Sequence, residues 1–411
     1  MDKDILNIVI VGHVDHGKST LIGRVLFDTG SIPEDKLAAI KAASGSGGGA
    51  KDPDLAFLTD QLKEEREKLM TIDTSQIRFS TSLRDYVIID SPGHVEFTKN
   101  MMTGATRADF GILVVSAVDG IKEQTRRHAY ILNMLGMKAL AVLINKMDLC
   151  AYSEERFNAT VREIEDFLRL IGTKMLYAIP VSAMKGDNIA KHSKNMRWYK
   201  GPTLLSCLDK FKEENMSVGK PLRFSVQDVY NIDGENVFVG RVESGAVRTG
   251  SGVSVLPAGE RTTVKDIKVF GVSRVSAEEG ENIGITLADD RKVLAGNIFS
   301  DEADPAVPRK SFYADLFWLA ESPMRSGERF TFRCASQEAE CVIEKIEKRI
   351  DSSTLETLEE MAGSVGPNEI GKVRLVTSKP VVVEDFAFIR GLGRFVLEND
   401  DGVQAAGIIT S

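Results

Sequence analysis

The chain has 411 residues, of which 43% are hydrophobic and 27% charged, an ordinary balance for a globular protein with two to four domains. A formal net charge of -8 argues against a general nucleic-acid-binding surface, because phosphate contacts need clustered lysine and arginine. No apolar run reaches the ~18 residues of a membrane span, and the four cysteines lack metal-ligand spacing. We therefore expect reduced thiols in a cytoplasmic protein without membrane partners.

The N-terminal half of the chain alternates apolar runs with amphipathic stretches. The apolar runs predict buried strands at Ile5–Val11, Tyr86–Ile89, Gly111–Val115, Ala139–Ile144 and Leu176–Val181. The amphipathic stretches predict helices at Ser19–Phe27, Lys122–Leu135 and Ser153–Ile171. Repeated strand–helix–strand order indicates a doubly wound, mostly parallel sheet with helices on both faces. A serine–glycine run at 44–49 predicts a flexible surface loop.

After about Gly219 the pattern changes to short β-rich runs separated by glycine-containing turns. The first of these runs are Val237–Val242, Val253–Leu256, Thr263–Val269 and Ile283–Leu287. A joint at Asp301–Pro308 precedes a second β-rich set, which an amphipathic stretch around Leu355–Met361 interrupts. The sequence thus predicts an α/β domain followed by two antiparallel β-barrel domains. The expected domain limits are 1–215, 219–303 and 308–411.

A glycine-rich turn between the first strand and the first helix fits the pattern G-x-x-x-x-G-K-S. In a P-loop the backbone amides surround the β-phosphate, Lys18 reaches the β and γ oxygens, and the Ser19 hydroxyl binds Mg²⁺. The helix that follows adds the positive end of its dipole. The nucleotide-binding residues expected here are Gly12, His13, Val14, Asp15, His16, Gly17, Lys18, Ser19 and Thr20.

Two later segments predict residues that face the γ-phosphate. Asp90 follows a strand and is expected to hold Mg²⁺ through water, while Pro92 and Gly93 form a turn that senses the phosphate. Thr71 is the candidate second Mg²⁺ ligand on a GTP-ordered loop, the alternative being a polar residue that starts an edge strand. His94 is the candidate for orienting the attacking water, the alternative being a structural histidine. The expected metal ligands are Ser19, Thr71 and Asp90. The other histidines receive no chemical role: His13, His16, His128 and His192.

A third motif, Asn145-Lys146-Met147-Asp148, follows another predicted strand. The Asp148 carboxylate can accept from both N1–H and the 2-amino group of guanine, a donor pair that adenine lacks. The backbone amides expected to meet guanine O6 belong to Ser182, Ala183 and Met184. Together with the P-loop, these motifs predict that the α/β domain is a P-loop G domain. It is expected to hold GTP or GDP with Mg²⁺.

The motifs at 12–20, 90–94 and 145–148 resemble the translation-factor GTPases of the elongation factor Tu and elongation factor 1-alpha class. The resemblance covers essentially the whole chain. It implies that the G domain is followed by two β-barrels that move against it with nucleotide state.

Within that class, some segments look like the GTPase subunit of bacterial two-subunit sulfate adenylyltransferase. These segments are 65–67, 71–73, 79–81 and Ala314–Trp318. The resemblance implies a GTPase that drives synthesis of adenylyl sulfate and pyrophosphate from ATP and sulfate by a partner catalytic subunit. Leu69 and Met70 depart from the glycine and isoleucine usual in the class, which leaves the tuning of hydrolysis open. The alternatives are an elongation-factor-like GTPase that binds aminoacyl-tRNA and a related GTPase that serves another enzyme.

Overall fold

The computed structural model describes residues 5–32, 76–90, 108–137, 139–211, 219–232, 234–269 and 272–410. The chain divides into two compact units, Met1–Glu213 (unit 1) and Glu214–Ser411 (unit 2). The serine–glycine run at 44–49 lies outside the described residues. The three domain limits given above stay a prediction, because both barrels fall within unit 2.

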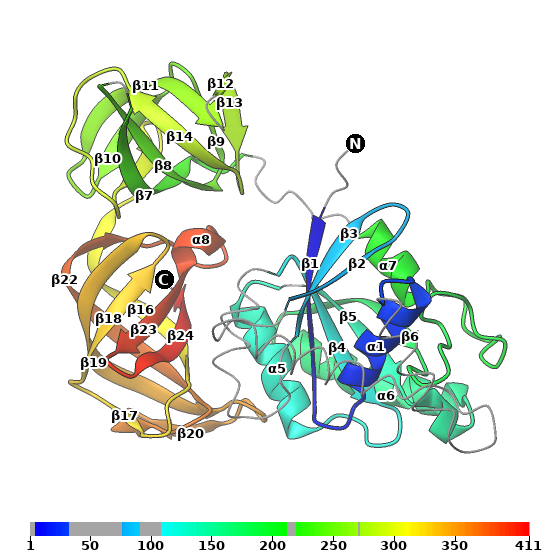
Figure 1. The fold of residues 1–411 in the computed structure, drawn as a ribbon. Coiled ribbons are helices and arrows are strands. Elements are labelled where there is room, and N and C mark those ends of the chain that lie inside the picture. The colour runs from blue at the N-terminus through cyan, green and yellow to red at the C-terminus, as the bar shows by residue number, and fades with distance from the viewer. Residues whose placement is uncertain are drawn as a thin grey trace. The chain divides into compact units, whose positions relative to one another are not determined.

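Unit 1 contains a six-stranded sheet of order β2-β3-β1-β4-β5-β6 (Figure 1). Its strands are β1 (Ile5–Gly12), β2 (Gln76–Ser80), β3 (Asp85–Asp90), β4 (Phe110–Ser116), β5 (Ala139–Asn145) and β6 (Lys174–Pro180). All neighbouring strands run parallel except β2, which pairs antiparallel with β3 at the edge. The predicted mostly parallel sheet is therefore confirmed, with β2 as an additional strand.

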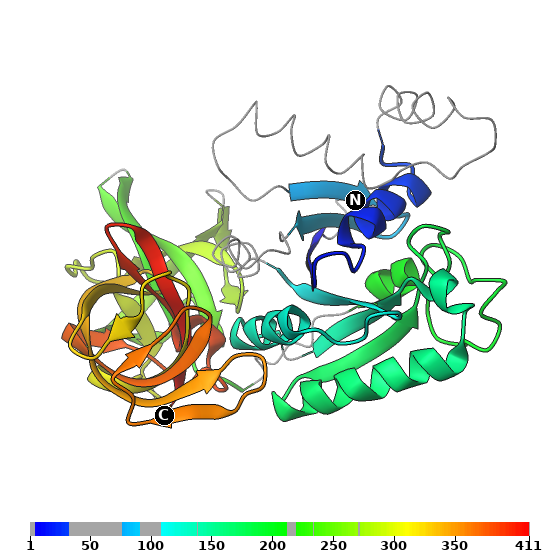
Figure 2. The ribbon, with the colours of Figure 1, turned by 90° about the horizontal axis from the view of Figure 1, so that it is seen from below.

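Helices cover both faces of this sheet. They are α1 (Lys18–Asp28), α5 (Glu123–Met134), α6 (Glu154–Leu170) and α7 (Leu204–Lys210). Residues of α1 and α7 share one core with the sheet, while α5 and α6 pack on the other face (Figure 2). Leu21 and Ile22 of α1 are fully buried against Ile8 and Ile10 of β1. Burying such a side chain contributes about 1.5–3 kcal/mol, which holds α1 and the loop before it against the sheet.

The last helix of unit 1 is bonded to the β2–β3 hairpin. The Asp209 carboxylate accepts hydrogen bonds from Thr81 Oγ1 at 2.7 Å and from the Tyr86 hydroxyl at 2.5 Å. Burial, together with the hydrogen bond to Asp209, raises the pKa of Tyr86 above its ordinary value. Arg84 donates from Nη1 to the Phe211 carbonyl at 2.9 Å, just beyond the end of α7. The hairpin and the C-terminal end of unit 1 are thus fixed together.

Unit 2 begins with a barrel in which six antiparallel strands close through the β10–β11 pairing. The closed strands are β7 (Arg223–Ile232), β8 (Glu235–Ser244), β10 (Gly252–Leu256), β11 (Glu260–Val269), β14 (Asn282–Leu287) and β15 (Ile298–Asp301). The remaining short strands are β9 (Ala246–Arg248), β12 (Val272–Arg274) and β13 (Ser276–Glu278). Phe224 and Phe299 are fully buried at the centre of this barrel.

A second barrel of six antiparallel strands closes through the β18–β19 pairing. Its strands are β16 (Pro308–Trp318), β18 (Arg329–Cys334), β19 (Gln337–Asp351), β22 (Glu369–Val382), β23 (Arg394–Asn399) and β24 (Gly402–Thr410). The short elements of this barrel are β17 (Met324–Arg325), β20 (Thr357–Glu360), β21 (Ser364–Val365) and α8 (Arg390–Gly393). The amphipathic stretch around Leu355–Met361 contains the short strand β20. Closure of both rings confirms the two predicted antiparallel barrels.

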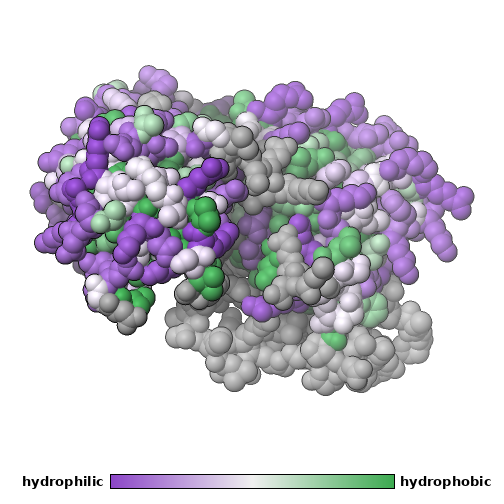
Figure 3. All heavy atoms as spheres, turned by 90° about the horizontal axis from the view of Figure 1, so that it is seen from above, coloured by the Kyte–Doolittle hydropathy of each residue, from purple (hydrophilic) through white to green (hydrophobic). Residues whose placement is uncertain are grey.

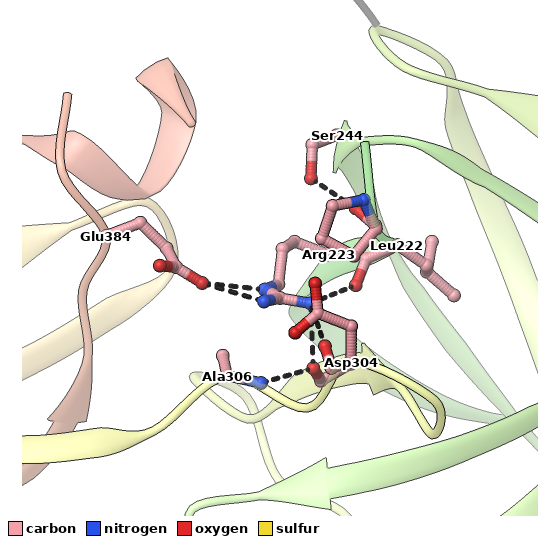
Figure 4. A network of polar contacts seen from close by, with 8 residues as sticks. Leu222, Arg223, Ser244, Asp304, Ala306 and Glu384 are labelled. Atoms are coloured by element: carbon pink, nitrogen blue, oxygen red, sulfur yellow. Dashed lines mark hydrogen bonds and ion pairs between the residues drawn. The ribbon is translucent and has the colours of Figure 1, made fainter. Parts of the chain in front are cut away.

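A buried arginine joins the two barrels (Figure 4). Arg223, at the start of β7, is only 2% exposed and contacts Glu384 Oε1 from Nε at 2.9 Å and from Nη2 at 2.8 Å. Its Nη1 donates to Ser300 Oγ at 3.0 Å and to the Asp304 carbonyl at 2.9 Å. Each bond compensates part of the cost of burying the guanidinium. The contact with Glu384 ties the first barrel to the segment that follows β22.

Much of the surface visible in Figure 3 is hydrophilic, with small separate hydrophobic areas. Among the helices of the described residues, none is long and apolar enough to cross a membrane.

The Arg223–Glu384 pair gives a stability prediction. Glu384→Ala leaves the buried Arg223 charge without its carboxylate, so we expect the free energy of unfolding to fall by about 3 kcal/mol. Denaturant unfolding of the full chain measures this loss. The matched control is Glu398→Ala, which removes a carboxylate from the half-exposed Arg333 and should cost less than about 1 kcal/mol. Equal losses in the two variants would contradict the role given to Arg223.

Candidate nucleotide-binding site

Two glycines of the loop between β1 and α1 are required by the close approach of neighbouring strands. A Cβ atom on Gly12 would collide with the carbonyl oxygen of Val114, its partner in the β1–β4 register. Gly17 has φ +88°, and a Cβ atom there would lie 2.5 Å from Asn145 Nδ2. Only glycine fits both positions without displacing the sheet. The loop is therefore pressed against the ends of β4 and β5.

Lys18 places its positive charge over this loop. Its Nζ donates to the carbonyl oxygens of Gly12 at 2.7 Å and of His13 at 2.9 Å. Gly17 caps α1 without a side-chain hydrogen bond among the described residues, so the positive end of the helix dipole points into the loop. A lysine and a helix N-terminus at one loop form a binding site for phosphate.

The buried side chain of Asn145 connects the P-loop with the loop after β6. Asn145 is 2% exposed at the end of β5. Its Nδ2 donates to the His16 carbonyl at 2.9 Å, and its Oδ1 accepts from the Ala183 amide at 3.0 Å. Parallel strands end at one edge of a sheet, so segments far apart in the sequence meet here. The structure thus brings the P-loop, the Asn145 motif and residues 182–184 together.

The chain turns sharply after Asn145. Lys146 has a left-handed backbone with φ +62°, and the short 3₁₀ helix η2 (Met147–Cys150) follows. Met147 is fully buried, and its amide donates to the Val181 carbonyl at 3.2 Å. This anchor leaves Asp148 partly exposed in the first turn of η2. The carboxylate is accordingly carried by a fixed turn at the strand ends.

Sequence reasoning missed the loop after β4, which ends at the same edge. Ser116 Oγ accepts from the amides of Val118 and Asp119, each at 3.2 Å. The hydrogen bond to Ser116 and the nearby Lys146 hold the pKa of Asp119 below its ordinary value. Arg156 of α6 donates from Nη2 to the Val118 carbonyl at 2.8 Å and so braces the loop. The position of Asp119 just beyond a predicted strand was the signal available in the sequence.

Three histidines lie in or beside the P-loop. His16 is 1% exposed, its Nδ1 lies 3.2 Å from the Val114 carbonyl oxygen, and its ring meets that of His13 edge-on at 5.2 Å. Burial lowers the pKa of His16 to about 4. Burial, with smaller contributions from Lys18 and His13, lowers the pKa of His128 in α5 to about 3. His16 and His128 are therefore neutral packing groups at pH 7, so neither adds positive charge to the phosphate loop.

The remaining predicted site residues stay without a structural test. The backbone of Asp90 ends β3 and pairs with Ile10 of β1. Four residues lie outside the described part of the chain: Thr71, Pro92, Gly93 and His94. Within the described part, no group of three or more histidine, cysteine, aspartate or glutamate side chains could hold a metal ion.

Comparison with known proteins identifies the family. The profile of the elongation factor Tu GTP binding domain matches residues 3–214, and that of the GTP-eEF1A C-terminal domain-like family matches residues 311–410. Elongation factor 1-alpha from Thermoplasma acidophilum is 39% identical, over 98% of this chain and 97% of its own length. The chain belongs to the elongation factor 1-alpha family of GTPases. Because the matched domain is a GTP binding domain, we conclude that the chain binds GTP and GDP.

A second curated relative has the same name and matches over nearly its full length. Elongation factor 1-alpha from Methanopyrus kandleri is 38% identical over 99% of this chain and 97% of its own. A crystal structure of sup35 complexed with GDP is 26% identical, covers 100% of this chain and 94% of its own, and has a TM-score of 0.47.

These names correct the finer prediction made from the sequence. The assignment to the GTPase subunit of sulfate adenylyltransferase is wrong, and so are the sulfate-assimilation role and the catalytic-subunit partner, because the relatives are elongation factors. The segment Ala314–Trp318 does not distinguish the two families. Leu316, Phe317 and Trp318 are buried in the second barrel, so their order reflects packing of a core strand.

The buried histidines predict a pH dependence. Their pKa values lie below the ordinary 6.5, so the unfolded chain binds more protons between about pH 4 and 6.5. The stability they contribute is complete above about pH 6.5 and is lost as the pH falls, by up to about 1.4 kcal/mol per unit for each histidine. Unfolding of the nucleotide-free protein between pH 5 and 7 measures the slope. His128→Gln should flatten it, and a slope equal to that of the exposed-site control His192→Gln would contradict the buried neutral state.

Proposed function

We propose that the protein is a translation elongation GTPase that binds aminoacyl-tRNA in its GTP state and releases it after hydrolysis. The observation that carries the proposal is a match at 39% identity over 98% of this chain to a protein named elongation factor 1-alpha. The match includes both barrels as well as the G domain. Such a function operates in the cytoplasm. The alternative of another partner enzyme has no observation in its favour.

The net charge of -8 is compatible with RNA binding if the contact is local. Arg309 and Lys310 are both exposed at the start of β16. Exposed cations of this kind supply phosphate contacts without a basic overall charge. They make the second barrel the first place to search for an RNA contact.

Ser19 and Asp90 are oxygen-bearing residues of the kind that Mg²⁺ prefers. Ser19 is the second residue of α1, and Asp90 ends β3 beside the strand that leads into the P-loop. A bound Mg²⁺ neutralises charge on the β and γ oxygens of the nucleotide. In the proposed mechanism Lys18 holds the same oxygens, Thr71 reports the γ-phosphate, and His94 orients the attacking water.

Replacing the Asp148 carboxylate by an amide tests the proposed contact with guanine. Asp148→Asn should weaken GDP and GTP binding by about 100-fold or more, because the new NH₂ group faces the guanine 2-amino group as a second donor and N1–H keeps only a neutral acceptor. Affinity for xanthosine diphosphate should rise, since the 2-keto group of xanthine accepts from the new amide. Equilibrium binding of the two nucleotides measures both changes. The control is Asp166→Asn, an exposed carboxylate of α6 that should leave both affinities unchanged.

Binding of aminoacyl-tRNA tests the function itself. The protein loaded with a non-hydrolysable GTP analogue should bind aminoacyl-tRNA at least about 100-fold more tightly than the GDP form, because a nucleotide shifts binding only through differential affinity. Protection of the aminoacyl ester from hydrolysis, at fixed salt, measures the affinity. Deacylated tRNA is the control ligand. Equal, weak binding in both nucleotide states would overturn the proposal.

A further inference from the structure

The guanine-binding turn ends in a strained corner. After η2 the chain passes through Ala151 and Tyr152, whose φ angles are +50° and +57°. Left-handed backbone costs conformational free energy in residues with a side chain, and here two such residues are consecutive. The corner therefore needs contacts that hold it. Asp148 lies three residues before Ala151, so movement of the corner would move the carboxylate.

Both backbone polar groups of Tyr152 are bonded. Its amide donates to the Met147 carbonyl at 2.8 Å, which closes η2. Its carbonyl accepts from the indole Nε1 of Trp198 at 3.0 Å. Trp198 is partly buried, and its ring lies 5.3 Å from that of the buried Phe157 in α6. The indole is thus held by α6 while it holds the corner.

The same corner is linked to the loop after β6. Burial, and then the negative charge of the nearby Asp187, raise the pKa of Tyr152 above its ordinary value. The Asp187 amide donates to the Ser182 carbonyl at 3.2 Å, and the Ser182 amide donates back to the Asp187 carbonyl at 3.3 Å. Ser193 Oγ donates to Asp187 Oδ1 at 2.5 Å. Met147, which accepts from the Tyr152 amide, also donates to the Val181 carbonyl at 3.2 Å, so a shift of Tyr152 would reach the strand end before residues 182–184 as well as Asp148.

We infer that Trp198 is a positioning residue for guanine: its indole N–H holds the Ala151–Tyr152 corner, and the corner fixes Asp148 and the amides of residues 182–184. This inference rests on the guanine contacts of the proposed function. The segment around Trp198 follows the last of the nucleotide motifs and is not itself expected to touch the nucleotide. Its effect is on the geometry with which the base is held.

The first test removes the indole donor and keeps an aromatic ring. Trp198→Phe should accelerate GDP dissociation by about five- to tenfold, since one hydrogen bond that orders the contacts is lost. Release of a fluorescent GDP analogue in stopped flow measures the rate. The matched control is Trp318→Phe, which removes the other indole–carbonyl bond of the chain, from Trp318 Nε1 to the Ser322 carbonyl at 2.7 Å in the second barrel. That variant should leave GDP release unchanged.

The second test asks whether the effect passes through the base. Inosine diphosphate lacks the 2-amino group, so one of the two contacts of Asp148 is already absent and the acceleration by Trp198→Phe should be smaller than for GDP. Adding Ala151→Gly should bring the GDP release rate of Trp198→Phe back toward wild type, because glycine adopts the left-handed corner without strain. A variant with merely loosened packing would show neither effect.

Several results would overturn the inference. They are unchanged GDP release in Trp198→Phe, equal acceleration for GDP and inosine diphosphate, and no recovery with Ala151→Gly. GDP release could be unchanged in Trp198→Phe while Asp148→Asn still loses guanine binding selectively. That pair of results would exclude the role of Trp198 and support the guanine contacts. Binding of aminoacyl-tRNA is measured separately, so its failure would bear on the proposed function alone.

Discussion

The nucleotide site depends on one buried side-chain amide. Asn145 donates to a carbonyl 129 residues before it and accepts from an amide 38 residues after it, and both bonds lie in the interior. Aspartate has no donor for the His16 carbonyl, leucine has neither function, and glutamine is longer by one methylene. A donor and an acceptor on one short, rigid side chain therefore fix the spacing between the phosphate loop and the guanine loops. Both partners of Asn145 are backbone groups, the His16 carbonyl and the Ala183 amide. Any replacement therefore leaves a buried backbone group without its partner.

Among the described residues, the phosphate loop beside this amide carries one strong cation. Lys18 lies over the loop carbonyls, and the two buried histidines beside it are neutral because burial disfavours their charged forms. Asp119 is ionised on the neighbouring loop, where Ser116 and Lys146 stabilise its charge. A second fixed cation in the loop would strengthen binding of the diphosphate product as well as binding of the triphosphate. The neutral histidines pack the loop without adding such binding.

The sequence predicts the elements whose signal is local, and misses those that tertiary contacts define. Strands β1, β4 and β5 are buried on both faces and form continuous apolar runs, so they were found. In the part of β2 whose side chains are described, buried Ile77 and Phe79 alternate with exposed Arg78 and Ser80, and this short alternation gave no apolar run to detect. The phosphate and guanine motifs carry their own spacing and were found for that reason.

Contacts between distant segments were not predictable in the same way. The position of Trp198 under the Tyr152 carbonyl follows from how the segment after β6 packs on α6, and no spacing in the sequence encodes it. The Arg223–Glu384 pair joins residues 161 positions apart, one in each barrel. The opposite error occurred at Ala314–Trp318, where the residue order of a core strand was interpreted as the signature of one family. Aromatic order in a barrel core reports volume and burial, which many functions share.

The G domain alone cannot decide between functions, because a P-loop, a switch aspartate and a guanine-specific turn serve every GTPase of this class. A functional decision has to come from the parts that meet a partner, and in the proposed function these include the barrels. Identity that extends at 39% over nearly the full length of both chains includes the barrels, so partner surfaces as well as the nucleotide site are within the similarity. The buried Arg223 side chain also holds the two barrels together through Glu384. Because it fixes one barrel to the other, surfaces on the two barrels are presented to a partner as one unit, and binding energy gained on either barrel is not spent on ordering the pair.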